Sequence, residues 1–320
     1  MLMFTCLAII VLTSTCAFGQ TPTLPPEFGP HLWTVAVRVI DEDSNPVPGA
    51  DVAVSYDIPA KPNSGGQTYG EIKGITDTNG MFNASHTDSS WGLGITVNKS
   101  GYYTTHGGHQ FYFDEKRRNP SFTLILKKIS KVIPMYAKNV NLGMPVFNKP
   151  AGYDLMVGDW VAPYGKGINS DIIFTGYLNK DMEGNVDYKL VVSFSNQGDG
   201  IQGFSVPLLL QNAVTGQSDL RSSSEAPLNG YQSEWIQVRN RKPHQAEAGN
   251  FDPNRIFYFR IRTVLDNQGN VVSTHYGKIY GDFMQFRYYL NPTPNDRSVE
   301  FDPKQNLLGG LNALEKVAAP

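Results

Sequence analysis

Apolar and polar residues alternate along much of the chain, with the period of two that is typical of half-buried β-strands. The clearest example is His31–Ile40, in which every second residue is large and apolar: Trp33, Val35, Val37 and Val39. Similar short runs occupy residues 50–56, 71–76, 81–85, 92–99 and 121–127. Tight turns separate them, and in one turn Asn79 and Gly80 supply the positive φ angles of a hairpin. Residues 31–129 are therefore expected to form a small antiparallel sandwich.

A second series of short apolar runs extends from about residue 150 to residue 303. The expected strands are residues 171–178, 188–196, 204–211, 234–238, 255–265, 271–277 and 283–289. Two turns rich in Asp, Asn and Gly, at residues 181–185 and 266–270, are good signals for hairpins. Short strands in succession with such turns are typical of sandwiches and jelly rolls. We therefore expect an all-β chain with a second, larger domain of that kind.

Three motifs in the first region carry a family resemblance. They are residues 37–41 with 45–52 (VRVID and NPVPGADV), 76–82 (TDTNGMF) and 95–102 (ITVNKSGY). Together they resemble the carboxypeptidase regulatory-like family, which has a G-x-P-(I/V)-x-G-A bend, a T-D-x-x-G-x-(F/Y) hairpin and a (V/I)-x-K-x-G-Y strand end. Asn45 stands where the first Gly of the bend is usual.

This resemblance covers about residues 31–129, less than a third of the chain. It implies a transthyretin-like or Ig-like antiparallel sandwich. Members of the family are usually accessory modules attached to enzymes, receptors or surface proteins, so the resemblance implies no catalytic residues here. The second region resembles no family, and it is not a repeat of the first because the motifs do not recur.

The expected organisation follows from these patterns. It runs from a signal peptide (1–19) through a Pro-rich linker (20–30) to the first sandwich (31–129), a linker (130–149), the second sandwich (150–303) and a tail (304–320). Polar loops are expected at residues 104–120, 217–231 and 239–254, and a short helix at 307–317. Within the second linker, residues 133–136 have the pattern of a short strand.

The N-terminus has the features of an export signal. Residues 7–12 (LAIIVL) form an apolar run, although no Lys or Arg precedes it. Ala17, Phe18 and Gly19 fit the small-x-small cleavage rule, which leaves Gln20 as the first residue. No later apolar stretch reaches the length of a transmembrane helix. The expected location is therefore outside the cytoplasm: secreted, periplasmic or on the cell surface.

Both cysteines, Cys6 and Cys16, lie in this leader. Acylation of Cys16 is an alternative, although residues 13–15 (TST) lack the Leu and the small residue of a lipoprotein signal. A mature chain that starts at Gln20 has no cysteine, which excludes disulfides, thiol catalysis and cysteine metal sites.

Composition narrows the range of partners. Aromatic residues make up 12% and charged residues 18% of the chain, with 31 Gly and 21 Pro, a mixture that suits strands and tight turns. The net charge of −2 gives no electrostatic footprint for nucleic acid or an anionic membrane. The expected partner is a polysaccharide or a surface protein.

Two kinds of residue cluster suggest metal sites. His106 and His109, with Tyr112 and Asp114 nearby, have ligand types suited to Zn²⁺ or Cu²⁺, but a third ligand at established spacing is missing. A solvated Gly-rich loop is the favoured interpretation of these residues. Acidic turns at residues 41–45 and 181–187 resemble calcium loops, yet Pro46 replaces the turn glycine, which excludes an EF-hand. No cofactor is expected, and an irregular Ca²⁺ site at a turn is left open.

One loop has the composition of a sugar-binding surface. Residues 158–167 (GDWVAPYGKG) combine aromatic rings, a carboxylate and a Lys among glycines, but Gly167 replaces the Ser or Thr of a phosphate-binding loop. Sugar rings stack on aromatic faces, and polar side chains take their hydroxyls. Trp160, Tyr164 and Trp235 are the candidate sugar contacts. The alternative is that both tryptophans belong to the sandwich core.

Sequence motifs of hydrolases are absent: no G-x-S-x-G, H-E-x-x-H or C-x-x-C occurs. Paired carboxylates are found by their separation in space, so Asp159, Asp171, Asp199 and Asp282 stay open as candidates. Three hypotheses follow. The first is an exported, non-enzymatic binding or adhesion module with no catalytic residues; the others are an extracellular hydrolase with its site in residues 150–303 and a purely structural envelope component.

Overall fold

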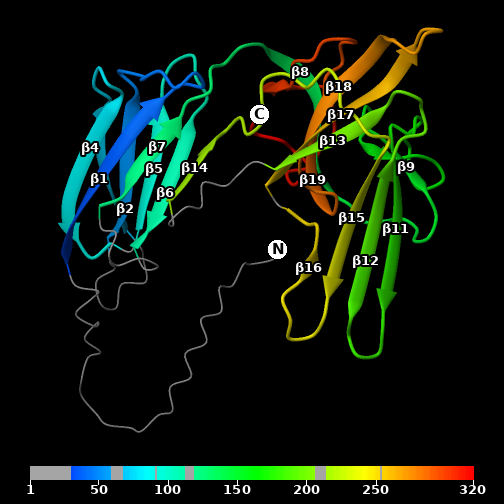
Figure 1. Ribbon diagram of the computed structural model, residues 1–320, viewed down its shortest axis with the longest axis horizontal. Helices are drawn as coiled ribbons and strands as arrows, with labels where there is room; N and C mark the ends of the chain where they lie inside the picture. Colours follow the sequence, from blue (N-terminus) through cyan, green and yellow to red (C-terminus); the bar gives the residue numbers. More distant parts are fainter. Residues whose placement is uncertain (1–29, 59–67, 91, 112–118, 206–213, 253) are drawn as a thin grey trace.

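The computed structural model of the chain describes residues 30–58, 68–90, 92–111, 119–205, 214–252 and 254–320 (Figure 1). All regular elements in these residues are β-strands, which form four sheets. The expectation of an all-β chain is confirmed. None of the described segments is a helix long and apolar enough to cross a membrane.

The first sandwich consists of seven consecutive strands and one strand from later in the chain. They are β1 (His31–Ile40), β2 (Asp51–Ile58), β3 (Thr68–Ile75), β4 (Met81–Asp88), β5 (Gly92–Asn98), β6 (Thr105–Gln110), β7 (Ser121–Ile125) and β14 (Val214–Ser218). A three-stranded sheet has the order β4-β1-β7, and a five-stranded sheet has the order β14-β6-β5-β2-β3. β1 pairs antiparallel with β4 and parallel with β7.

Alternation along the strands builds the core of this sandwich, as the sequence pattern predicts. The inward residues of β1 are at most 1% exposed: Trp33, Val35, Val37 and Val39. They pack with residues of the other sheet such as Val52 and Ile95. Gly80, in the predicted hairpin, has a φ of +72°, and an added Cβ would lie 2.4 Å from the carbonyl oxygen of Val39. The turn therefore needs glycine at this position.

The sequence expectation of a loop over residues 104–120 is wrong for its first part. Thr105–Gln110 form β6, which pairs antiparallel with β5 on one side and β14 on the other. β14 comes from the region assigned to the second domain, and Figure 1 shows it along the edge of the first sandwich. Gly107 and Gly108 lie opposite Gly216 and Thr215, and such glycines carry no periodic apolar signal, which is why the pattern did not predict either strand.

The second sandwich contains the other twelve strands. They are β8 (Val132–Asn141), β9 (Ala151–Asp154), β10 (Asp159–Trp160), β11 (Ile172–Lys180), β12 (Val186–Ser193), β13 (Gly200–Ser205), β15 (Glu234–Arg241), β16 (Ala248–Gly249), β17 (Arg255–Leu265), β18 (Val271–Asp282), β19 (Gln285–Leu290) and β20 (Glu300–Asn306). One six-stranded sheet has the order β10-β9-β11-β12-β15-β16, and the other has the order β13-β17-β18-β19-β8-β20. A large aromatic core between them includes Phe174, Phe257, Phe283 and Tyr288.

Two further sequence expectations are corrected by these strands. Half of the expected linker 130–149 is β8, which lies between β19 and β20 inside a sheet. The expected helix at 307–317 does not form, and the tail instead begins with β20, which runs parallel to β8. Pro134, Asn139 and Asn141 interrupt the apolar pattern of β8, so its pairing partners rather than its own periodicity make it a strand.

The sheet with the order β13-β17-β18-β19-β8-β20 is buried on both faces. Along β18, Ile279 faces the core between the sheets, whereas Tyr276 and Tyr280 belong to a third apolar cluster on the opposite face. Ala226 and Val317 contribute to that third cluster from the segments that cover this face. A sheet covered on both sides forms a rigid support for the segments that lie on it.

Candidate functional site

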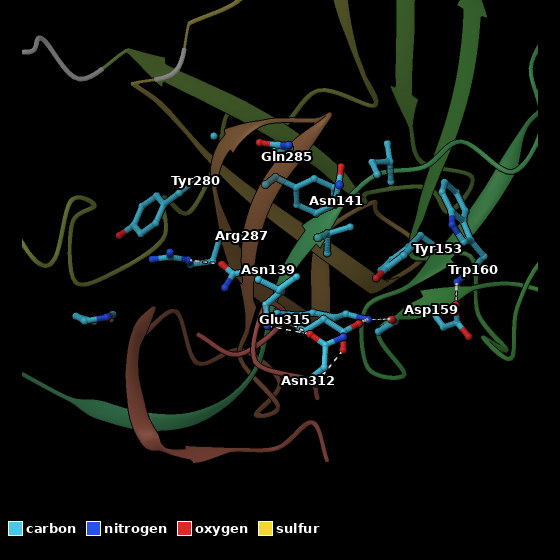
Figure 2. Close-up of a pocket in the computed structure, with 18 of the residues that line it drawn as sticks. Asn139, Asn141, Tyr153, Asp159, Trp160, Tyr280, Gln285, Arg287, Asn312 and Glu315 are labelled. Atoms are coloured by element: carbon cyan, nitrogen blue, oxygen red, sulfur yellow. Dashed lines mark hydrogen bonds and ion pairs between the residues drawn. The ribbon is translucent and has the colours of Figure 1, made fainter. Parts of the chain in front are cut away.

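A groove with a volume of about 750 Å³ lies on the second sandwich. Its walls come from β8, β18 and β19, from the loop around β10 and from the C-terminal segment. Figure 2 shows Trp160 and Asp159 at one end, Arg287 and Tyr280 at the other, and Asn139 between them. The groove therefore joins parts of the chain that lie far apart in the sequence.

Asp154, at the end of β9, holds the loop that carries Trp160. Its buried carboxylate accepts the backbone N–H groups of Met156 and Val157 at 3.0 and 3.1 Å, and those of Ile168 and Asn169 at 3.0 and 2.9 Å. Burial alone would raise the pKa of Asp154, but these backbone N–H groups and Arg262 lower it. One side chain thus ties both ends of residues 155–169 together.

Arg262 braces this loop from the facing sheet. Its Nε lies 2.8 Å from Oδ1 of Asp171, and its Nη2 lies 3.3 Å from Oδ1 of Asp154. Arg262 has a φ of +54° at an irregularity in the pairing of β17 with β18. Asp199 accepts the backbone N–H groups of Arg262 and Thr263 at 3.0 and 2.8 Å, which holds the irregularity in place.

Trp160 is half buried and belongs partly to the core. Its ring meets Tyr153 edge to face at 5.4 Å between centroids and Phe174 at 5.7 Å. Asp159 accepts the backbone N–H groups of Trp160 and Lys166 at 2.8 and 3.1 Å, which closes the loop into a compact turn. The ring is therefore fixed by packing while it lines the groove.

The opposite wall combines cationic and aromatic groups. Arg287 donates from Nε to Oδ1 of Asn139 at 2.7 Å, and the guanidinium of Arg221 lies 5.2 Å from the centroid of the Tyr280 ring. Two exposed amides, Asn141 and Gln285, are direct cross-strand partners on β8 and β19. These groups supply donors and acceptors along the groove.

Lys138 and Glu315 form an ion pair of 2.8 Å in the same wall. Lys138 also donates to the carbonyl oxygen of Gly158 at 2.8 Å, and Glu315 accepts the backbone N–H of Asn312 at 3.0 Å. The hydrogen bond from Lys138 lowers the pKa of Glu315. The pair links the loop, β8 and the C-terminal segment, so its charges are engaged within the protein.

The candidate carboxylates for hydrolysis do not meet in the groove. Of the four, Asp159 lines it, whereas Asp199 and Asp282 are not among the lining residues and accept backbone N–H groups. Burial raises the pKa of Asp171 against the opposing effect of Arg262, but Asp171 lies outside the lining set as well. The general acid of a glycosidase needs a carboxyl group with a raised pKa beside the scissile bond. Asp171 has a raised pKa but does not line the groove, so the groove does not hold this arrangement among the four candidates.

The structure does not bring the three predicted sugar contacts together. Trp160 lines the groove, but Tyr164, which is 40% exposed, and Trp235 do not. Trp235 packs against Phe257 at 5.1 Å, under the guanidinium of Arg255 at 4.9 Å. The strand order β10-β9-β11-β12-β15 separates the two tryptophans by roughly 19 Å.

The two histidines predicted as metal ligands lie on opposite faces of β6, because they are three residues apart in a strand. The side chain of His106 is 53% exposed and lies 3.4 Å from Oδ1 of Asp219. His109 is 1% exposed and packs against Phe111 at 5.1 Å. The structure therefore does not bring them together. Tyr112 and Asp114 lie outside the described residues.

The acidic turns considered for Ca²⁺ form hairpin tips. Asp41 accepts the backbone N–H groups of Asp43 and Asn45 at 3.0 and 2.8 Å, and Asp181 does the same for Glu183 and Asn185 at 3.0 and 2.9 Å. Within the described ranges, no three His, Cys, Asp or Glu side chains are grouped so that they could hold a metal ion. The predicted turns at 181–185 and 266–270 are confirmed.

A second, smaller hollow of about 270 Å³ lies on the outer face of β11, β12 and β15. Tyr177 is 42% exposed there, and Nζ of Lys189 lies 5.8 Å from the centroid of its ring. Asp187 and Asn240 are cross-strand neighbours beside it. This hollow is an alternative ligand site on the same sandwich.

Sequence reasoning missed most of the groove. Arg287 and Gln285 are polar residues of a strand, and Arg221 lies in a segment expected as a loop. Such residues give no signal until the sheet order places them beside the loop of Trp160. The one usable signal was the aromatic and glycine content of residues 158–167.

Comparisons with known proteins show no family for this chain. No family model matches it, and no curated protein matches it. The shaft pilin SpaA from Lactobacillus rhamnosus GG is similar in structure at 10% identity over 85% of this chain and 95% of that chain, with a TM-score of 0.22. A streptococcal ancillary pilin has 10% identity over 85% of this chain and 61% of that chain, with a TM-score of 0.18.

A 9R-lipoxygenase from Cyanothece PCC8801 is a further similar structure, at 10% identity over 72% of this chain and 43% of that chain, with a TM-score of 0.20. Identities and TM-scores this low transfer no activity or partner to the chain. Functional inference therefore rests on the groove.

Proposed function

We propose that this chain is an exported, non-enzymatic β protein of the cell surface or its surroundings, and that the groove binds a polysaccharide. The observation that carries the proposal is the groove itself, which has a volume of about 750 Å³ and a fixed tryptophan at one end. Ligand sites are concave, partly aromatic and few in a protein, with a small number of polar groups that orient the ligand.

The chemistry of the walls suits a sugar. The faces of sugar rings carry C–H groups, which stack on aromatic rings such as that of Trp160. The exposed amides of Asn141 and Gln285 offer both donors and acceptors, as hydroxyl groups require. Loop and strands are held by hydrogen bonds and packing, so the site is formed before a ligand arrives.

Export and the role of the first sandwich belong to the same proposal. The expected leader and the cysteine-free chain after Gln20 fit a protein that works outside the cytoplasm. The resemblance of residues 31–129 to regulatory-like modules fits a spacer that presents the second sandwich. The edge strand β14 joins the two regions, which supports a fixed presentation of the groove.

A glycan array with the full chain tests the proposed binding, with Asn141→Ala as the groove variant. Loss of one hydrogen bond to the ligand is expected to weaken binding about tenfold. Tyr177→Ala, in the hollow on the outer face, is the matched control and should bind like the unaltered protein. Absence of any glycan binding, or loss of binding in Tyr177→Ala alone, would contradict the proposal.

A further inference from the structure

Two arginines, Arg221 and Arg287, line the groove at the end opposite Trp160. Arg287 belongs to β19, and Arg221 lies in the segment that follows β14. Tyr280 lies beside Arg221, at 5.2 Å from the guanidinium to the ring centroid, and Figure 2 shows Arg287 at the same end of the groove. Burial raises the pKa of Tyr289, and the charges of both arginines oppose that rise. Both guanidinium groups therefore lie close enough to Tyr289 to influence its hydroxyl group.

Neither guanidinium is neutralised by a carboxylate. In the part of the chain that the structure describes, no Asp or Glu forms an ion pair with Arg221 or Arg287. The other charged side chains of the groove have partners of their own: Lys138 pairs with Glu315 at 2.8 Å, Asp159 accepts two backbone N–H groups, and Asp219 lies 3.4 Å from Nε2 of His106. Neither arginine therefore has a carboxylate at ion-pair distance among the described residues.

The Nε atom of Arg221 adds an independent observation. It is buried, yet it has no hydrogen-bond partner among the described residues. Buried donors without an acceptor are rare in folded proteins, and each one calls for an explanation such as an absent ligand. The Nε of Arg287, by contrast, is satisfied by Asn139 at 2.7 Å. Arg221 thus lacks an acceptor at the end of the groove that Arg287 also lines.

We propose that the polysaccharide bound in this groove is acidic, and that Arg221 and Arg287 hold one of its carboxylates. This inference rests on the proposed function and names its ligand class. The planar guanidinium presents paired N–H donors that match the two oxygens of a carboxylate, which a hydroxyl group cannot do. A carboxylate there gives Nε of Arg221 its missing acceptor and offsets one of the two positive charges.

The two ends of the groove then have separate tasks. Trp160 stacks on a sugar ring, and the arginines select the sugar that bears the carboxylate. Asn139, on β8 between the two ends, orients Arg287 through the hydrogen bond from Nε. Because aromatic rings stack on many sugars, the arginine pair is the part of the site that provides selectivity.

The test compares acidic polymers with their own neutral forms. Polygalacturonate, alginate and hyaluronan are each titrated into the full protein beside the same polymer with its carboxyl groups reduced to alcohols. We expect the acidic form of at least one polymer to bind about tenfold or more tightly than its reduced form. The preference should shrink between about 0.05 M and about 0.5 M NaCl, because salt screens the charges.

Variants assign the preference to the two arginines. Arg221→Gln and Arg287→Gln keep polar side chains of similar length, and each is expected to weaken binding of the acidic form about tenfold while leaving the reduced form unchanged. Arg38→Gln, on the exposed face of β1, is the matched control for loss of one positive charge. Thermal unfolding of each variant reports whether the fold is intact.

The outcomes separate this inference from the proposed function. Equal binding of acidic and reduced polymers, or a preference that survives both groove variants, overturns the acidic ligand and leaves polysaccharide binding standing. A loss in Arg38→Gln as large as in Arg287→Gln would show attraction by net charge alone and would also overturn it. If none of these polymers binds and the glycan array is empty, both proposals fail.

Discussion

Nζ of Lys278 donates a hydrogen bond to Oγ of Ser222 over 3.1 Å, and both side chains are buried. The same Ser222 hydroxyl accepts a hydrogen bond from Tyr280 at 3.0 Å and donates one to the carbonyl oxygen of Ser223 at 2.8 Å. Ser222 directly follows Arg221 in the chain. This network therefore fixes the segment that brings Arg221 to the groove.

Lys278 should make stability depend on pH. Burial lowers its pKa well below the ordinary value of 10.5, and of the nearby charges Glu300 opposes this shift and Arg287 adds to it. The unfolded chain keeps the proton up to about pH 10.5, whereas the folded chain has released it at a lower pH. Between these two pKa values the unfolded state binds more protons, so the free energy of unfolding rises with pH.

Lys278→Met isolates this contribution, because it keeps most of the side-chain volume and removes the titrating group. Through that interval the unaltered protein should gain stability relative to the variant by about 1.4 kcal/mol per pH unit. Urea unfolding of both proteins at a series of pH values measures the difference. A difference that stays constant with pH would mean that Lys278 does not lose its proton in the folded protein.

Asp154 is expected to be the main support of the groove loop. Asp154→Ala leaves four backbone N–H groups without their acceptor, and a loss of about 2–4 kcal/mol in the free energy of unfolding should follow. Urea unfolding gives the loss, and hydrogen exchange should show faster exchange in residues 155–169. Asp181→Ala, at an exposed hairpin tip, should change stability far less. Comparable losses in the two variants would contradict the role of Asp154.

Trp160 should contribute to both stability and binding. Trp160→Ala removes its contacts with Tyr153 and Phe174 and is expected to cost about 2–3 kcal/mol of stability, since the side chain is half buried. Trp160→Phe keeps an aromatic ring and should cost less while it still weakens glycan binding several-fold. Unfolding and titration of both variants measure the two effects. Full glycan affinity in Trp160→Ala would exclude the ring as a sugar contact.

Gly216 of β14 should be sensitive to any larger side chain. A Cβ at this position would lie 2.9 Å from Cδ2 of Leu124, a buried residue of β7. Gly216→Val should therefore destabilise the protein by about 1–3 kcal/mol and speed hydrogen exchange in β6. Gly143→Val is the control, because nothing lies within 4 Å of a Cβ there. If both variants unfold at the same denaturant concentration, β14 does not close the first sandwich tightly.

Local patterning accounts for most of the strands that the sequence predicted. β1 and β17 alternate apolar and polar residues or carry long apolar runs, and their bounds match the expected ranges. β8 was expected as a linker with a short strand, β6 was expected as part of a loop, and β14 was not expected as a strand, because proline, asparagine or glycine interrupts their pattern. Those strands form because neighbouring strands satisfy their backbone groups, and this pairing depends on the whole chain.

The residues of the candidate site were likewise predicted only in part from the sequence. Trp160 was a candidate from the composition of its loop, and it lines the groove. Trp235, in the expected strand 234–238, was a further aromatic candidate for the same surface, but it packs against Phe257 instead. Residue type alone does not separate these two outcomes, because a tryptophan serves equally well in a core and on a ligand surface. Arg221 and Arg287 become partners through the sheet order, which no local pattern contains.

Hydrogen exchange of the full protein with and without a bound polysaccharide tests the central claim most directly. The groove proposal predicts slower exchange on binding in residues 138–142, 158–160 and 285–287, which line the groove. Residues 177–189, on the outer face with Tyr177, should exchange at an unchanged rate. Slower exchange confined to residues 177–189, with the groove segments unaffected, would contradict the claim and place the ligand on the outer face.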